Sequence, residues 1–105
     1  MTKMIRFLMV LAVTVCLAGT VSFAQSGGEA IYKAKCAMCH GATGTPSAGM
    51  AKSMGIKAAS DPSMKALTVA QMIAVVKNGK GKMKPVTGLS DQQIEAVVAF
   101  YRSLK

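Results

Sequence analysis

The segment Cys36-Ala37-Met38-Cys39-His40 decides the fold of this chain of 105 residues. A redox-active cysteine pair at this spacing would begin a helix after a strand of a βαβ unit, and the sequence contains no such unit. A structural zinc site needs four ligands, whereas two cysteines and the single histidine supply three. A disulfide between Cys36 and Cys39 would close a very short loop and stabilise little.

The remaining interpretation is covalent attachment of haem, for which C-x-x-C-H is the known pattern. Two thiols three residues apart project from the same side of a helical turn, where they can add to the two vinyl groups on one edge of a porphyrin. The following imidazole then lies under the iron as the proximal ligand. We therefore predict that Cys36 and Cys39 form thioethers to one haem c and that His40 binds its iron.

The first 24 residues have the pattern of a secretory signal peptide. Lys3 and Arg6 are basic, residues 7–18 are almost entirely apolar, and Ser22-Phe23-Ala24 offers a cleavage site. The apolar run is shorter than the roughly 20 residues that a membrane-spanning helix needs. We expect cleavage after Ala24 and export to the periplasm, with an uncleaved N-terminal anchor as the alternative.

The composition favours a small domain that needs a cross-link or a bound cofactor to stabilise its core. Only 5% of the residues are aromatic and there is no Trp, so large core side chains are scarce. Two cysteines remain beyond the predicted leader, too few for a disulfide framework. These counts exclude large α/β enzymes, multi-spanning transporters and disulfide-stapled toxins. A covalent haem would supply the missing apolar surface.

The sequence beyond residue 25 predicts helices joined by Gly-rich loops, an all-α fold. A capping box is expected at Ser26, and Gly41 and Gly44 end the first helix. A brief helix is predicted over 48–54, and Asp61-Pro62 is a turn signal. Thr68 caps a helix whose Val69, Met72, Ile73 and Val76 form one apolar stripe. Ser90 and Gln93 form a capping box for the last helix, whose apolar face is Ile94, Val97, Val98, Tyr101 and Leu104.

The chain resembles a small class I cytochrome c of the bacterial, short-chain kind over nearly all of residues 26–105. Gly28, Tyr32 and Cys36 match the spacing of the family's N-terminal helix, and Val97 and Phe100 match the residues that cross that glycine. The resemblance implies a cytochrome c domain over 25–105, with three main helices and short helical turns around one covalent haem. The family often uses a loop proline carbonyl to accept from the proximal histidine, and Pro46 is the nearest candidate.

The sixth iron ligand is predicted to be Met83, in a Gly-rich loop that resembles the methionine loop of the family. Lys84 stands directly after it, where the family often has proline. Met72 is expected to pack in the core, whereas Met50 and Met54 are expected to line the haem pocket without ligating. Ile73, Val76, Met54 and Leu67 are expected to form its apolar shell. A lysine of this loop could replace Met83 only by losing a proton, which is costly near neutral pH.

With His40 and Met83 both bound, the iron has no open position, so the sequence predicts a one-electron carrier and not an enzyme. The alternative is a five-coordinate haem protein that binds small gases or reduces peroxide. The net charge is +9, and six lysines flank the predicted haem edge: Lys33, Lys35, Lys77, Lys80, Lys82 and Lys84. We expect a monomer that docks redox proteins through their acidic patches. Nucleic acid and small-molecule substrates are not expected as partners.

Overall fold

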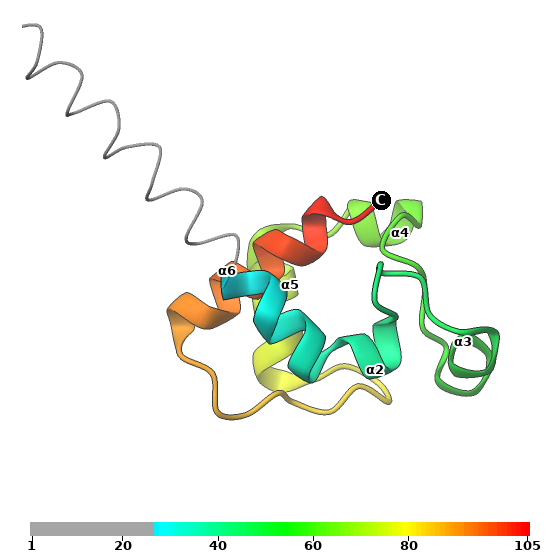
Figure 1. Ribbon diagram of the computed structural model, residues 1–105, viewed down its shortest axis with the longest axis horizontal. Helices are drawn as coiled ribbons and strands as arrows, with labels where there is room; N and C mark the ends of the chain where they lie inside the picture. Colours follow the sequence, from blue (N-terminus) through cyan, green and yellow to red (C-terminus); the bar gives the residue numbers. More distant parts are fainter. Residues whose placement is uncertain (1–26) are drawn as a thin grey trace, which may run out of the picture.

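The computed structural model describes residues 27–105, so the predicted signal peptide and the expected cap at Ser26 lie outside it. Residues 27–35 are helical and lead directly into α2 (Ala37–His40). The later helices are α3 (Ala48–Met54), α4 (Pro62–Lys65), α5 (Val69–Asn78) and α6 (Asp91–Ser103) (Figure 1). These residues contain no strand beyond one isolated bridge, and the fold is all-α, as the sequence predicts. No helix among them is long and apolar enough to cross a membrane.

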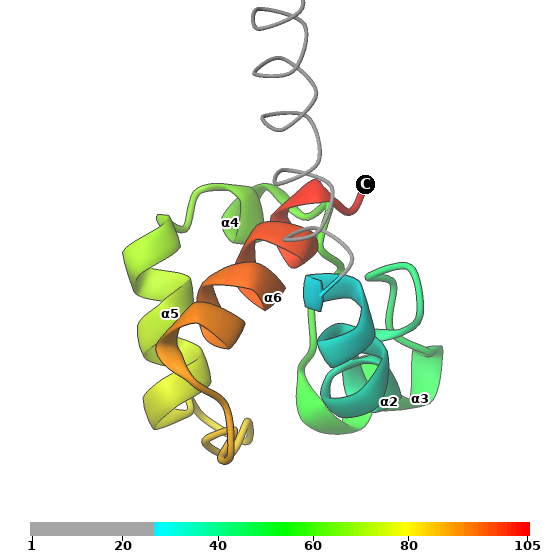
Figure 2. The same ribbon diagram turned by 60° about the vertical axis from the view of Figure 1, so that its left-hand side comes forward.

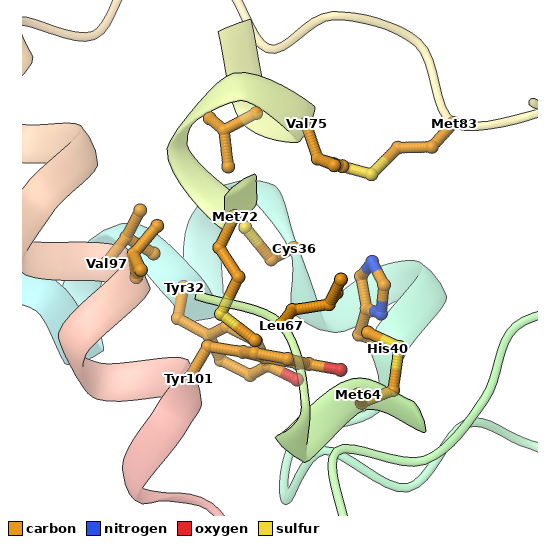
Figure 3. Close-up of a pocket in the computed structure, with 12 residues that line it drawn as sticks. Tyr32, Cys36, His40, Met64, Leu67, Met72, Val75, Met83, Val97 and Tyr101 are labelled. Atoms are coloured by element: carbon orange, nitrogen blue, oxygen red, sulfur yellow. The ribbon is translucent and has the colours of Figure 1, made fainter. Parts of the chain in front are cut away.

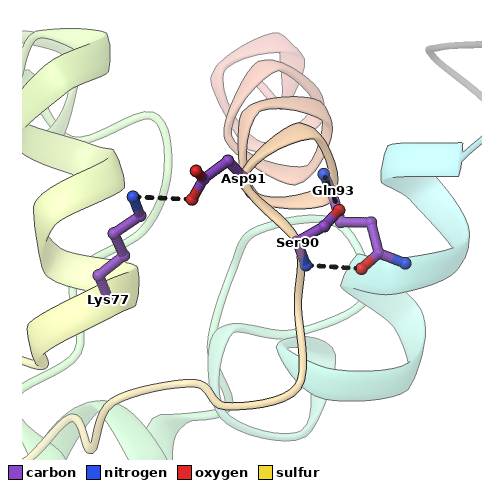
Figure 4. A network of polar contacts seen from close by, with 4 residues as sticks. All are labelled: Lys77, Ser90, Asp91 and Gln93. Carbon is purple, nitrogen blue, oxygen red and sulfur yellow. Dashed lines mark hydrogen bonds and ion pairs between the residues drawn. The ribbon is translucent and has the colours of Figure 1, made fainter.

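The capping signals for α5 and α6 act as the sequence predicts. The Thr68 and Ser90 hydroxyls accept hydrogen bonds from the backbone N–H of Gln71 and Gln93, at 3.1 and 3.2 Å. Each glutamine side chain in turn accepts from the N–H of its capping residue at 2.8 Å, so both capping boxes are complete. Figure 4 shows the box of Ser90 and Gln93. Lys77 pairs with Asp91 at 2.9 Å and links the end of α5 to the start of α6.

The Asp61-Pro62 signal begins the short helix α4 instead of a simple turn. The Asp61 carboxylate accepts from the N–H of Ser63 at 2.9 Å, and Pro62 occupies the first turn, where its missing N–H costs nothing. Lys65 then donates to the carbonyls of Arg102 and Leu104, at 3.3 and 2.8 Å. This lysine therefore caps the end of α6 and fixes α4 beside it.

The core lies where α5 and α6 run side by side (Figure 2). Met72, Ile94 and Val98 are buried at its centre, and Leu67, Ile73, Val76, Leu89 and Tyr101 pack around them. The predicted apolar stripe of α5 is correct for Met72, Ile73 and Val76. It is wrong for Val69, the first residue of α5, which is 46% exposed.

The first helix crosses α6 at a glycine, as the resemblance implies. A Cβ on Gly28 would collide with the carbonyl oxygen of Ala96 and would lie 3.1 Å from Cβ of Phe100. The two backbones therefore approach as closely as they do only because residue 28 has no side chain. One turn later, Tyr32 is 1% exposed, and its ring centroid lies 5.3 Å from that of Phe100.

Candidate functional site

An apolar pocket lies between α5, α6 and the segment that carries the two cysteines (Figure 3). Its lining residues come from the first helix, α2, α4, α5, α6 and the loop after α5, so most of the fold contributes to it. They are Tyr32, Cys36, His40, Met64, Leu67, Met72, Val75, Val76, Met83, Val97, Val98 and Tyr101. The polar atoms that these side chains bring are two tyrosine hydroxyls, one thiol and the imidazole nitrogens.

The predicted attachment segment forms one helical turn. The backbone N–H groups of Cys39 and His40 both donate to the carbonyl of Cys36, at 3.2 and 3.0 Å. Gly41, with φ of +82°, then ends the turn. Cys36 and His40 line the pocket, whereas Cys39 is half-buried beside it. The turn thus brings one thiol and the imidazole to the same pocket wall.

Burial disfavours the charged forms of the titratable groups in the pocket. It lowers the pKa of His40 and raises the pKa of Cys36, the latter against the opposing charge of Lys35. The pKa of Tyr32 is raised to about 12, chiefly by burial, and its hydroxyl donates to the Gly41 carbonyl at 2.5 Å. Nδ1 of His40 is buried without a hydrogen-bond partner, so the expected bond to the Pro46 carbonyl is not made.

A tight turn places Met83 on the pocket. Lys80 and Met83 exchange two backbone hydrogen bonds, at 2.9 and 3.0 Å, and Gly81 turns between them with φ of +58°. Downstream, the N–H of Val86 donates to the carbonyl of Val76 at 2.9 Å and ties the loop back onto α5. The Met83 side chain lies at the pocket edge across from His40 in Figure 3. These two predicted ligands, far apart in sequence, are therefore lining residues of one cavity.

The other methionines that line the pocket are not the ones that the sequence predicts. Met64 and Met72 line the pocket, and Met72 also belongs to the core as predicted. Met50 and Met54 are not among the lining residues, because α3 stands away from the pocket. The prediction of which residues form the apolar shell of the pocket is correct for Leu67 and Val76. It is wrong for Met54 and for Ile73, and Ile73 packs against the core instead.

Sequence reasoning did not assign Met64, Val75 or Tyr101 to the pocket. Tyr101 stands on the predicted apolar face of α6, and its ring lies edge-on to that of His40 with centroids 5.6 Å apart. Its position four residues after Val97 was the available signal, because side chains at that spacing share one helix face. Met64 had no such signal, since α4 was not predicted.

The residues present fit a flat apolar cofactor. The cavity wall is apolar, a thiol stands at its side, and a buried imidazole with an unpartnered nitrogen faces it. Together with the all-α fold, this is the arrangement of a cytochrome c domain. Residues 24–100 match the family described as "Cytochrome C oxidase, cbb3-type, subunit III", and the chain belongs to this family. It therefore carries a covalently bound c-type haem and takes part in haem-based electron transfer. A comparison with curated proteins finds no match.

Proposed function

We propose that the chain is a periplasmic one-electron carrier with one haem c bound through Cys36 and Cys39. His40 and Met83 would bind the iron from opposite faces. The observation that carries the proposal is the shared cavity, which His40 lines from the end of α2 and Met83 from the loop after α5. The backbone hydrogen bonds between Lys80 and Met83 and the close approach of Gly79 hold Met83 there, so the backbone conformation fixes its position.

The haem supplies the one-electron couple, and the chain supplies its ligands and surroundings. An imidazole and a thioether together leave no coordination position for oxygen, peroxide or substrate. The lining side chains Leu67, Val75 and Val76 exclude water and disfavour the extra positive charge of oxidised iron. The thioether of Met83 acts in the same direction, and both favour the reduced state.

The six lysines around the predicted haem edge differ in whether their ammonium groups already have a partner within the chain. Lys77 is paired with Asp91, Lys33 pairs with Glu29 at 3.0 Å, and Lys82 donates to the Ser53 carbonyl at 2.7 Å. Lys35, Lys80 and Lys84 are exposed. These three would steer the protein, as a monomer, onto an acidic patch of its redox partners.

Carbon monoxide tests the ligation directly. Reduced holoprotein with both His40 and Met83 bound should take up carbon monoxide slowly and weakly, because a ligand must first leave. Rapid, tight binding would show an open iron position and would favour the gas-binding or peroxide-reducing alternative.

The N-terminus of the exported protein tests the location. Mass spectrometry should find a chain that begins at Gln25 and is released with the periplasmic fraction. A retained leader in the membrane fraction would instead identify a tethered carrier.

A further inference from the structure

Two buried polar atoms without hydrogen-bond partners face the same part of the pocket. Among residues 27–105, buried side-chain nitrogen or oxygen atoms lack a partner at Nδ1 of His40 and at the hydroxyl of Tyr101. The two rings meet edge to face, with centroids 5.6 Å apart and planes at 72°. In Figure 3 the hydroxyl end of Tyr101 points toward His40. Leaving either atom unpaired costs about 1–3 kcal/mol, so each needs a partner.

No backbone carbonyl accepts a hydrogen bond from Nδ1 of His40 in the structure, and several carbonyls of the attachment turn already accept from other groups. The Cys36 carbonyl accepts from the N–H groups of Cys39 and His40, and the Ala37 carbonyl accepts from Gly41. The Gly41 carbonyl accepts from the Tyr32 hydroxyl. Pro46, which the family resemblance suggested as acceptor, does not reach Nδ1. The Tyr101 hydroxyl also lacks a partner, and its ring contacts the imidazole, so this fold brings an unpaired oxygen to the side of the unpaired nitrogen.

We propose that the Tyr101 hydroxyl oxygen accepts a hydrogen bond from Nδ1–H of His40 in the haem-loaded protein, which makes Tyr101 a positioning residue for the proximal ligand. The proposal rests on the proposed ligation by His40, because an imidazole bound through Nε2 carries its proton on Nδ1. Such a bond fixes the ring orientation and raises the electron donation of the imidazole to iron. The reduction potential is lower than it would be without that bond.

The test is Tyr101→Phe in reduced and oxidised holoprotein, which removes one oxygen and keeps the ring against His40. The reduction potential should rise, since a less basic imidazole stabilises oxidised iron less. By proton magnetic resonance of the reduced protein, Nδ1–H of His40 should exchange with solvent about tenfold faster, equivalent to one lost hydrogen bond. Tyr32→Phe removes the other tyrosine hydroxyl of the pocket, which bonds Gly41, and it should speed the exchange of Nδ1–H less than Tyr101→Phe does.

Three outcomes would each overturn the assignment. An unchanged potential and an unchanged Nδ1–H, with the iron–thioether absorption intact, would remove the role of Tyr101 and leave the His40/Met83 ligation standing. A fall in potential would mean that the hydroxyl donates to a carboxylate of the haem instead. If Tyr101→Phe does not bind haem, the test is made on the wild-type holoprotein by proton magnetic resonance. The absence of magnetisation transfer between Nδ1–H of His40 and the Tyr101 ring protons would then refute the bond. Loss of histidine ligation in the wild type would instead refute the proposed function.

Discussion

Gly79 lies against the carbonyl oxygen of Met83. A Cβ on Gly79 would be 2.6 Å from that oxygen and 2.9 Å from Cδ of Pro85, and Gly79 has φ of +75°. Both the space and the backbone conformation therefore require glycine at this position. The close approach closes the turn that carries Met83, so the residue that ends α5 also sets the position of the proposed ligand.

Gly79→Ala should displace the Met83 loop. The new methyl group would meet backbone and a proline ring, neither of which can rotate away, and we expect a loss of about 2–3 kcal/mol in unfolding free energy. The absorption due to the iron–thioether bond should weaken as well. Gly81→Ala is the matched control, because Gly81 has φ of +58° but nothing within 4 Å of the added carbon. It should cost only about 1–2 kcal/mol and keep the absorption. Equal spectra for the two variants would contradict the role of Gly79.

Gly28→Ala should separate the first helix from α6. Its Cβ would collide with the Ala96 carbonyl, so we expect a loss of about 2 kcal/mol or more in chemical denaturation. Gly27→Ala, one residue earlier in the same helix, meets nothing within 4 Å and should be neutral or stabilise by about 0.5–1 kcal/mol. Equal effects of the two changes would show that the crossing is not tight.

Alkaline pH should destabilise the fold through Tyr32. Its pKa is raised from 10.0 to about 12, so the unfolded chain loses this proton first as pH rises. The contribution to stability is complete below pH 10 and falls between pH 10 and 12, by about 2 kcal/mol at the upper end. Tyr32→Phe should flatten that part of a curve of unfolding free energy against pH. An identical slope in the variant would contradict the assignment.

Reversal of the charge at any one of Lys35, Lys80 and Lys84 should slow electron transfer to an acidic redox partner. The bimolecular rate should fall at low salt and approach the wild-type rate at high ionic strength, because screening removes steering. Lys105→Glu makes the same charge change at the chain end, on the opposite side of the fold from the Met83 loop (Figure 1). It should change the rate little. A wild-type electron-transfer rate that does not depend on ionic strength would contradict the proposal that these lysines steer docking.

The helices could be predicted because their signals are local. The capping boxes at Thr68 and Ser90 and the spacing of Ile94, Val97 and Val98 are set within a few residues, and the structure contains them. The short helix α4 was missed because a proline and one aspartate resemble a turn when considered alone.

The pocket could be predicted only in part, because its walls depend on how helices cross. Periodicity shows that Tyr101 and Ile94 share one face of α6, but not that Tyr101 reaches His40 while Ile94 meets α5. In the same way, Met54 is a helical methionine near the loop, yet α3 stands outside the cavity that Met64 lines. Ligand pairs such as His40 and Met83 came from motif and resemblance, and their ligation stays a prediction.

The near-red absorption of the oxidised holoprotein tests the central claim most directly, since a ferric iron–thioether bond gives a weak band there. The band should be present in the wild type, absent in Met83→Ala and retained in Met64→Ala, which removes another thioether from the same pocket. A wild-type protein without the band, or a band that survives Met83→Ala and disappears in Met64→Ala, would contradict ligation by Met83.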